Sequence, residues 1–178
     1  MKTFKSIAVV KYPLALVWTT VRDRLPELVP LMDDIDSVTV VERIQDPDGT
    51  VRLVNLWQAK LQIPPMLTSV IRPDRLAWTD RAEWRSERYE CHWRIEPQFL
   101  PDQTQYAGMT RYEAAIGGRG TRVTFEGQLD VPTRGLLDSS LLLEGALAKG
   151  VESVVTTLIP KNFQKLAQTL SIFLDKET

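Results

Sequence analysis

One acidic residue stands out in the sequence because of the aromatic residues around it. Asp80 lies between Trp78 and Trp84 in a segment whose alternate residues are apolar. Burial among aromatic rings raises the pKa of a carboxyl group, because the charged form loses its hydration. Such a group could transfer a proton near neutral pH, while tyrosine hydroxyls stabilise an enolate beside it. Asp80 is therefore the only candidate catalytic residue, and a role without catalysis is the favoured interpretation.

Other residues that often bind metals or phosphates are poorly placed to do so. Cys91 and His92 are adjacent, so on a strand they must face opposite sides and cannot hold one ion. The acidic residues of segment 33–36 lack the further ligands and the glycine of a calcium loop, which favours a solvated turn. The glycine-rich segment 117–120 precedes a strand rather than a helix, which favours a hairpin turn over a phosphate loop. We expect no metal and no cofactor.

Composition excludes several classes of protein. The 178 residues include 22 basic and 23 acidic side chains, and no segment concentrates the basic ones, so a nucleic-acid partner is not expected. The most apolar segment, residues 136–147, is interrupted by Asp138 and Glu144, so we expect no transmembrane segment. The single cysteine cannot form an internal disulfide, which is typical of a cytoplasmic protein.

The N-terminal third should form one strand, two short helices and a hairpin. Residues 3–11 are β-branched and apolar enough for a strand, and Pro13 then suits the first helical position. The next apolar residues follow helical spacing and predict one buried stripe: Leu14, Val17, Trp18, Val21 and Leu25. A second short helix is predicted at residues 27–32. Strands at 35–45 and 50–63 should follow, joined by a turn at residues 46–49 that contains Pro and Gly.

The remainder should form two further hairpins and a long helix. Strands are predicted at residues 76–85 and 88–96, and then at residues 104–116 and 121–131. Residues 66–74 could form a short strand or one helical turn. About seven strands that are neighbours in sequence indicate an antiparallel meander. Residues 135–176 repeat apolar side chains at helical spacing around Pro160, so they form one bent helix or two helices.

Strand alternation assigns each side chain to a face of this sheet. Large aromatic residues share the inner face with Asn55, Asp80 and Thr110, whereas His92 faces solvent. An apolar cavity with a few polar groups is typical of small-molecule sites. The alternative is that Asn55 and Asp80 bond backbone groups or a buried water in a filled core.

The order of elements and three short motifs resemble the START-like superfamily, which includes polyketide cyclases, lipid-transfer domains and proteins of the birch pollen allergen type. The motifs are residues 12–18 (YPLALVW), 73–78 (PDRLAW) and 120–125 (GTRVTF). The resemblance implies one α+β domain over residues 1–178, of helix-grip type, with a curved antiparallel sheet wrapped around a long C-terminal helix. It also implies an apolar ligand and, in a minority of members, catalysis on polyketides.

The favoured function is binding of a hydrophobic small molecule, such as a lipid or aromatic polyketide, between the sheet and the C-terminal helix. The expected ligand-binding residues are Asn55, Trp57, Trp78, Asp80, Tyr89, Trp93, Thr110, Tyr112, Val151 and Val155. A cyclase or aromatase acting through Asp80 is the first alternative. The second is a protein-binding domain with a filled core, which would use the outward residues Val41, Val54 and Leu56. A monomer or weak dimer is expected.

Overall fold

The computed structural model describes residues 2–60, 76–98, 105–130 and 159–178 of the chain. Within them, a seven-stranded antiparallel sheet has the order β1-β7-β6-β5-β4-β3-β2. The strands are β1 (Lys2–Val10), β2 (Ile35–Gln45), β3 (Val51–Ala59), β4 (Ala77–Arg85), β5 (Glu90–Pro97), β6 (Gln105–Ala115) and β7 (Gly120–Asp130). The predicted meander is confirmed, and β1 completes it by pairing with β7.

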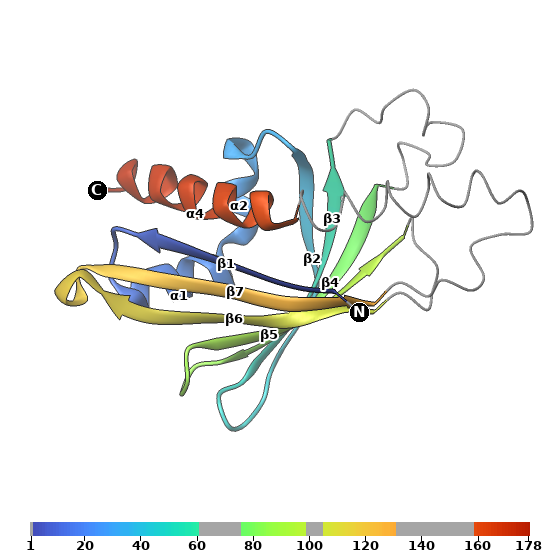
Figure 1. The fold of residues 1–178 in the computed structure, drawn as a ribbon, viewed down its shortest axis with the longest axis horizontal. Coiled ribbons are helices and arrows are strands. Elements are labelled where there is room, and N and C mark those ends of the chain that lie inside the picture. The colour runs from blue at the N-terminus through green and yellow to red at the C-terminus, as the bar shows by residue number, and fades with distance from the viewer. Residues whose placement is uncertain (1, 61–75, 99–104, 131–158) are drawn as a thin grey trace, which may run out of the picture.

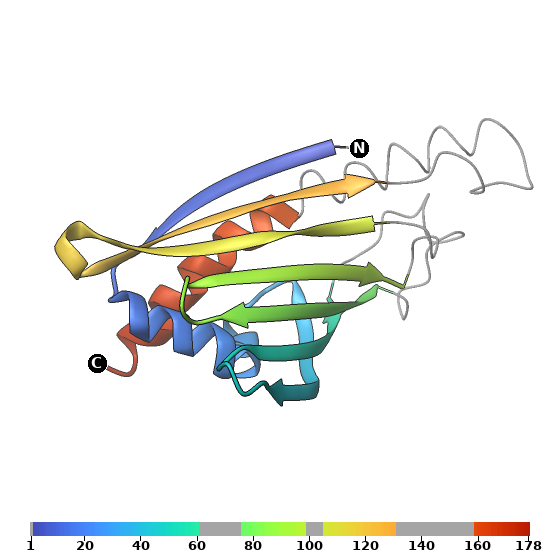
Figure 2. The same ribbon diagram turned by 90° about the horizontal axis from the view of Figure 1, so that it is seen from below.

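The helices lie together on one side of this curved sheet, as Figures 1 and 2 show. They are α1 (Leu14–Asp23), α2 (Leu25–Leu28) with the 3-10 turn η1 (Val29–Leu31), and α4 (Ile159–Asp175). The α4 helix crosses the sheet, contacts β1 and reaches α2. This arrangement confirms the α+β helix-grip prediction, with two short helices after the first strand. No helix of the described residues is long and apolar enough to span a membrane.

Proline sets the starts of both N-terminal helices. Pro13 occupies the N-cap, so α1 begins at Leu14, one residue later than predicted. Val17, Trp18 and Val21 form the buried stripe that helical spacing predicted. The α2 helix begins at Leu25, two residues earlier than predicted, because Pro26 lies in the first turn, where a missing N–H group costs nothing.

One strand boundary differs from the prediction at a predicted site residue. Tyr89 was assigned to a strand of residues 88–96, but β5 begins at Glu90 and Tyr89 lies in the turn after β4. Its φ of 52° is in the left-handed region, so it cannot continue the strand. Its carbonyl accepts the Tyr112 N–H at 2.9 Å and anchors the turn to β6.

Two glycine turns behave as their residue types predict. Gly49 has a φ of 85° in the β2–β3 turn, where Asp48 Oδ1 accepts the Thr50 N–H at 2.9 Å. Gly117 and Gly118 also have positive φ between β6 and β7. The segment 117–120 is therefore a hairpin turn. The predicted connector at 66–74, the strand beyond residue 60 and the helix before residue 159 lie outside the described residues.

The inward side chains form rows across the sheet that build the core. In one row, the pairing register brings Trp93 beside Gly108, and Gly108 beside Gly127. The absence of Cβ atoms lets the Trp93 ring lie flat over both glycines, because a Cβ on either would come within 2.7 Å of the indole. Trp93 then stacks on Phe125 with a centroid distance of 4.8 Å, and Phe125 stacks on Phe163 of α4 at 4.7 Å. Here the space between sheet and helix is filled by rings.

Candidate functional site

The candidate site is built around a polar pair on the inner face of β3 and β4. Asn55 and Asp80 are opposite each other in the β3–β4 register. Asn55 Nδ2 donates a long hydrogen bond of 3.5 Å to Asp80 Oδ2. Asn55 is only 2% exposed, while Asp80 as a whole residue is half-buried. The same row continues through Ile95 of β5 to Tyr106 of β6.

Two indoles form the apolar side of the site in the next row. Trp57 and Trp78 are opposite each other on β3 and β4, and their rings stack at 5.6 Å with an interplanar angle of 13°. Both remain half-buried, and they pack against a small cluster that includes Ile35 and Val38. The stacked pair therefore keeps part of its surface accessible beside the Asn55–Asp80 pair.

Burial changes the electrostatics of Asp80. Loss of hydration raises the pKa of its carboxyl group from 3.8 to about 6, although interactions with Asn55 and then Trp57 partly oppose the shift. The carboxylate has no ion-pair partner among the described residues to lower its pKa further. The pKa of Asp80 is thus raised in the direction that burial among aromatic rings predicts, into the mildly acidic range.

Four buried polar atoms of the described chain lack hydrogen-bond partners. Two belong to this site, Asn55 Oδ1 and Trp57 Nε1, whereas the Tyr106 hydroxyl, whose ring packs against Phe4 and Trp93, and Trp84 Nε1 belong to other parts of the core. Trp57 Nε1 is close enough to Asp80 to affect its pKa, but the geometry falls short of a hydrogen bond. An unsatisfied buried polar atom costs about 1–3 kcal/mol. Two of them beside one carboxylate favour a bound polar group, either a water molecule or part of a ligand.

Tyr106 is a further inward aromatic residue of β6, and it is not among the ligand-binding residues that the sequence predicts. Tyr106 is 1% exposed, and both burial and the Asp80 charge raise the pKa of its phenol. The phenol therefore stays protonated and can donate. Only the strand register could have indicated its relation to Asp80, because the two residues lie on strands separated by β5.

Four predicted site residues are engaged with other protein groups. Trp93 Nε1 donates to Thr110 Oγ1 at 3.1 Å, and both residues are buried. Tyr89 and Tyr112 each make an edge contact with Trp18 of α1, at 5.3 and 5.2 Å. We therefore leave these four residues out of the site proposed below. Two more of the predicted residues, Val151 and Val155, lie outside the described residues.

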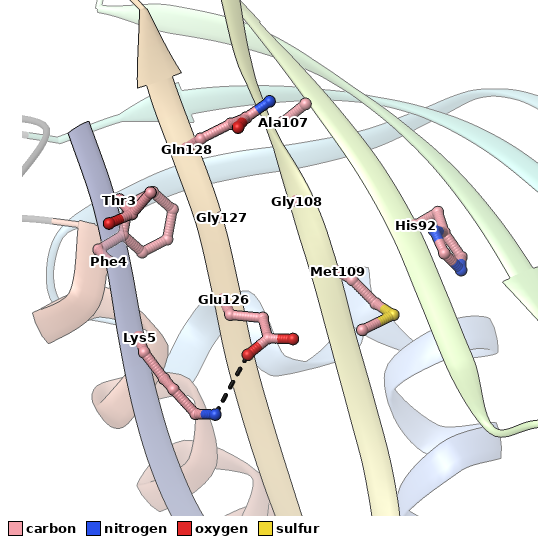
Figure 3. A pocket seen from close by; sticks show the side chains of 10 residues that line it. All are labelled: Thr3, Phe4, Lys5, His92, Ala107, Gly108, Met109, Glu126, Gly127 and Gln128. Carbon is pink, nitrogen blue, oxygen red and sulfur yellow. Dashed lines mark ion pairs between the residues drawn. The ribbon is translucent and has the colours of Figure 1, made fainter. Parts of the chain in front are cut away.

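Two open hollows lie on the outer face of the sheet, away from Asp80. The larger, of about 860 Å³, lies over β1, β7, β6 and β5 (Figure 3). Lys5 and Glu126 form an ion pair of 3.2 Å across it, with Met109 and His92 farther along. The second hollow lies over β2 to β5 and also includes His92. These open surfaces lack the buried unpartnered atoms of the inner face, so they are weaker candidates.

The outer face also carries the residues of the protein-binding alternative. Val41 is 63% exposed at a bulge in β2, whereas Val54 and Leu56 of β3 are half-buried. These apolar residues do not indicate which partner would cover them.

The potential metal ligands are dispersed in the described residues. Cys91 is buried, and burial raises its pKa well above the ordinary value. His92 lies on the outer face, 3.4 Å from Glu90. This confirms the prediction that the two face opposite sides. The described chain has no group of three or more His, Cys, Asp or Glu residues that could hold an ion.

Comparison with known proteins identifies the fold. No family model and no curated protein sequence matches the chain. Similar solved structures include TTHA0849 from Thermus thermophilus, with 19% identity, a TM-score of 0.61 and coverage of 96% of this chain and 94% of that one. The Zhui aromatase/cyclase from Streptomyces sp. R1128 has 14% identity, a TM-score of 0.63 and coverage of 94% and 93%. A START superfamily protein from Mycobacterium smegmatis has 11% identity, a TM-score of 0.51 and coverage of 99% of both chains. The chain therefore has the START-like helix-grip fold.

Proposed function

We propose that the protein binds a hydrophobic small molecule against the inner face of its sheet. Trp57 and Trp78 contact the apolar body of the ligand, and the Asn55–Asp80 pair contacts its polar end. The observation that carries this proposal is the group of buried, unpartnered polar atoms beside two stacked, partly accessible indoles. This combination is the one that small-molecule sites present: apolar walls with a few polar groups that orient the ligand.

The two ends of the inner face differ in a way that supports this location. Around Trp93 the rings of Phe125 and Phe163 fill the interior, and the Trp93 indole N–H is satisfied by Thr110. Around Asp80 polar atoms remain unsatisfied, and the indoles keep accessible surface. Removing apolar surface from water supplies about 25 cal/mol per Å², before the cost of ordering the ligand.

Tryptophan substitution tests the location of the site. We expect N-phenylnaphthylamine, an uncharged fluorescent probe, to bind the purified protein and to increase its emission. Trp57→Phe should weaken this binding about three- to tenfold, because it removes apolar contact area. Trp84→Phe is the matched control, since Trp84 is buried against Trp18 with a centroid distance of 4.9 Å.

Two results would contradict the proposal. One is the absence of probe binding to the folded protein. The other is an equal loss of binding in both tryptophan variants, which would indicate a general effect on the core. Native mass spectrometry of the freshly purified protein provides a direct check, because a co-purified apolar compound would identify the ligand class.

A second candidate function is proton transfer by Asp80 in a cyclase-like reaction. The pKa of about 6 suits a group that exchanges protons near neutral pH, and Tyr106 is a neutral phenol in the same row. The chain also shares its fold with an aromatase/cyclase. A linear polyketone that the protein cyclises should be turned over at least tenfold more slowly by Asp80→Asn, and unchanged turnover would rule out this role.

A further inference from the structure

The orientation of Asn55 determines which kind of ligand group the site can accept. The Asn55 amide donates from Nδ2 to the Asp80 carboxylate, so its carbonyl oxygen must point elsewhere. That oxygen, Oδ1, has no partner within the described residues although Asn55 is 2% exposed. An amide carbonyl is only an acceptor. The pair therefore presents one free acceptor, Asn55 Oδ1, beside a carboxylate that interacts only with the Asn55 amide and the Trp57 indole among the described residues.

No protein cation satisfies this demand within the described chain. Burial sets the Asp80 pKa, with contributions only from Asn55 and Trp57, both of which are uncharged. Lys165 of α4 pairs instead with Asp34, and Arg43 of β2 pairs with Asp23.

The titratable groups that interact with Asp80 from the neighbouring strands are also uncharged. They are Cys91 of β5 and Tyr106 and Tyr112 of β6. Burial, followed by the charge of nearby acidic groups, keeps the pKa of each above its ordinary value. The Asp80 charge is thus the only one in this set at neutral pH.

We propose that the ligand carries a hydrogen-bond donor at its polar end, an alcohol or an ammonium group rather than a carboxylate, which Asn55 Oδ1 and Asp80 bind together. This inference rests on the proposed binding function and adds the chemical class of the ligand. An alcohol satisfies one acceptor, whereas an ammonium group also neutralises the buried carboxylate. A carboxylate ligand would face like charge in an apolar environment, which is strongly unfavourable.

A series of ligands with one body and different head groups tests this preference. The compounds are methylnaphthalene, naphthylmethanol, naphthylmethylamine and naphthoate, measured by isothermal titration calorimetry at pH 7.5. We expect the amine to bind at least tenfold more tightly than methylnaphthalene, and the alcohol about threefold more tightly. Naphthoate should bind at least tenfold more weakly than the amine. At pH 5, where Asp80 takes up a proton, the amine and naphthoate should differ less.

Two substitutions test whether Asp80 and Asn55 produce the preference for a donor head group. Asp80→Asn keeps the shape of the side chain and should remove most of the preference for the amine over methylnaphthalene. Asn55→Leu removes the free acceptor and should weaken the alcohol about tenfold. Glu83→Gln is the matched control, because it removes a carboxylate from the outer face of the same strand, where Glu83 pairs with Arg85. Circular dichroism verifies that each variant is folded.

The outcomes separate this inference from the function on which it rests. If methylnaphthalene and all its derivatives fail to bind, the proposed binding function is wrong, and the inference fails with it. If methylnaphthalene binds, but the head groups rank equally or naphthoate binds best, the function stands and the donor preference is wrong. A preference that persists in Asp80→Asn and Asn55→Leu also overturns the inference, since other residues would then produce it.

Discussion

At the scale of single residues, Asp80 lowers the stability of the fold at neutral pH. Its carboxyl group has a pKa of about 6 in the folded protein, against 3.8 as its ordinary value. The folded state therefore binds a proton more tightly than the unfolded chain does. The sign follows directly: between about pH 4 and pH 6, this group destabilises the fold increasingly as the pH rises.

Asp80→Asn should remove this cost. We expect the variant to become more stable relative to the original protein as the pH rises. The free energy of unfolding of the variant minus that of the original protein should be about 2–3 kcal/mol larger at pH 8 than at pH 4. Urea denaturation followed by circular dichroism at both pH values measures the difference. Glu83→Gln serves as the control, because its difference in free energy of unfolding from the original protein should be nearly the same at both pH values. A constant difference for Asp80→Asn as well would show that Asp80 titrates normally.

Gly108 illustrates a different residue-scale constraint, which is space. A Cβ at this position would lie 2.2 Å from the Glu126 carbonyl oxygen and 2.5 Å from the Trp93 ring. Because the first of these is a backbone atom, the strand itself would have to shift. Gly49 has no atom within 4 Å of such a Cβ, but its φ of 85° is strained for other residues.

Comparison of the two glycines distinguishes crowding from backbone strain. Gly108→Ala should lower the free energy of unfolding by about 2–3 kcal/mol through overpacking. Gly49→Ala should lower it by about 1 kcal/mol, the usual cost of a left-handed conformation. Thermal unfolding followed by circular dichroism ranks the variants. If Gly49→Ala proved the more damaging, the close packing of Trp93 over β6 and β7 would be in doubt.

At the scale of elements, α4 has one face that packs on the sheet and one that faces water. Leu170 and Leu174 are buried in the main core, whereas Ile172 is 49% exposed. Polar contacts at its C-terminal end hold the helix in place: Arg24 bonds Glu177 at 2.5 Å and lies 4.7 Å above the Phe173 ring, and Tyr12 donates to Asp175. Packing and these contacts together fix α4 against α1 and α2.

Two substitutions of similar size on α4 test which face packs. Leu170→Ala should lower the free energy of unfolding by about 2–4 kcal/mol, because it leaves a cavity in the core. Ile172→Ala, only two residues away, should change it by less than about 0.5 kcal/mol. Urea denaturation followed by tryptophan fluorescence provides both values. Equal effects would mean that the helix is rotated relative to the sheet.

At the scale of the whole molecule, one core joins nearly every element. A single cluster of buried residues includes Val10 of β1, Trp18 of α1, Leu28 of α2, Trp84 of β4 and Leu170 of α4. The first and last strands in the sequence, β1 and β7, pair with each other, so the sheet joins residues that are far apart in the chain. A core shared in this way makes independent unfolding of its parts unfavourable.

The chain should therefore unfold as a single domain. We expect urea unfolding curves from far-ultraviolet circular dichroism and from tryptophan fluorescence to coincide, with one calorimetric transition. Two separate transitions would contradict the prediction that residues 1–178 form one cooperative unit. The β1–β7 pairing is long-range, so folding should take milliseconds to seconds, as stopped-flow fluorescence can verify.

Local patterns in the sequence determined most of the elements. Helical spacing predicted the buried stripe of α1, turn residues predicted both glycine hairpins, and alternation placed Cys91 inside and His92 outside. These succeeded because each depends on backbone geometry over a few residues. Tyr89 was misplaced because its positive φ belongs to a longer turn, which no short-range pattern in the sequence indicated.

Only the tertiary structure decided which inward residues are covered by other side chains. Alternation gives the face of a side chain, but not whether a distant helix or ring covers it. Trp18 covers Tyr112, and the β3–β4 register leaves Asn55 Oδ1 without a partner beside Asp80 among the residues that the structure describes. Such contacts depend on how strands and helices pack, so residues far apart in the chain determine them together.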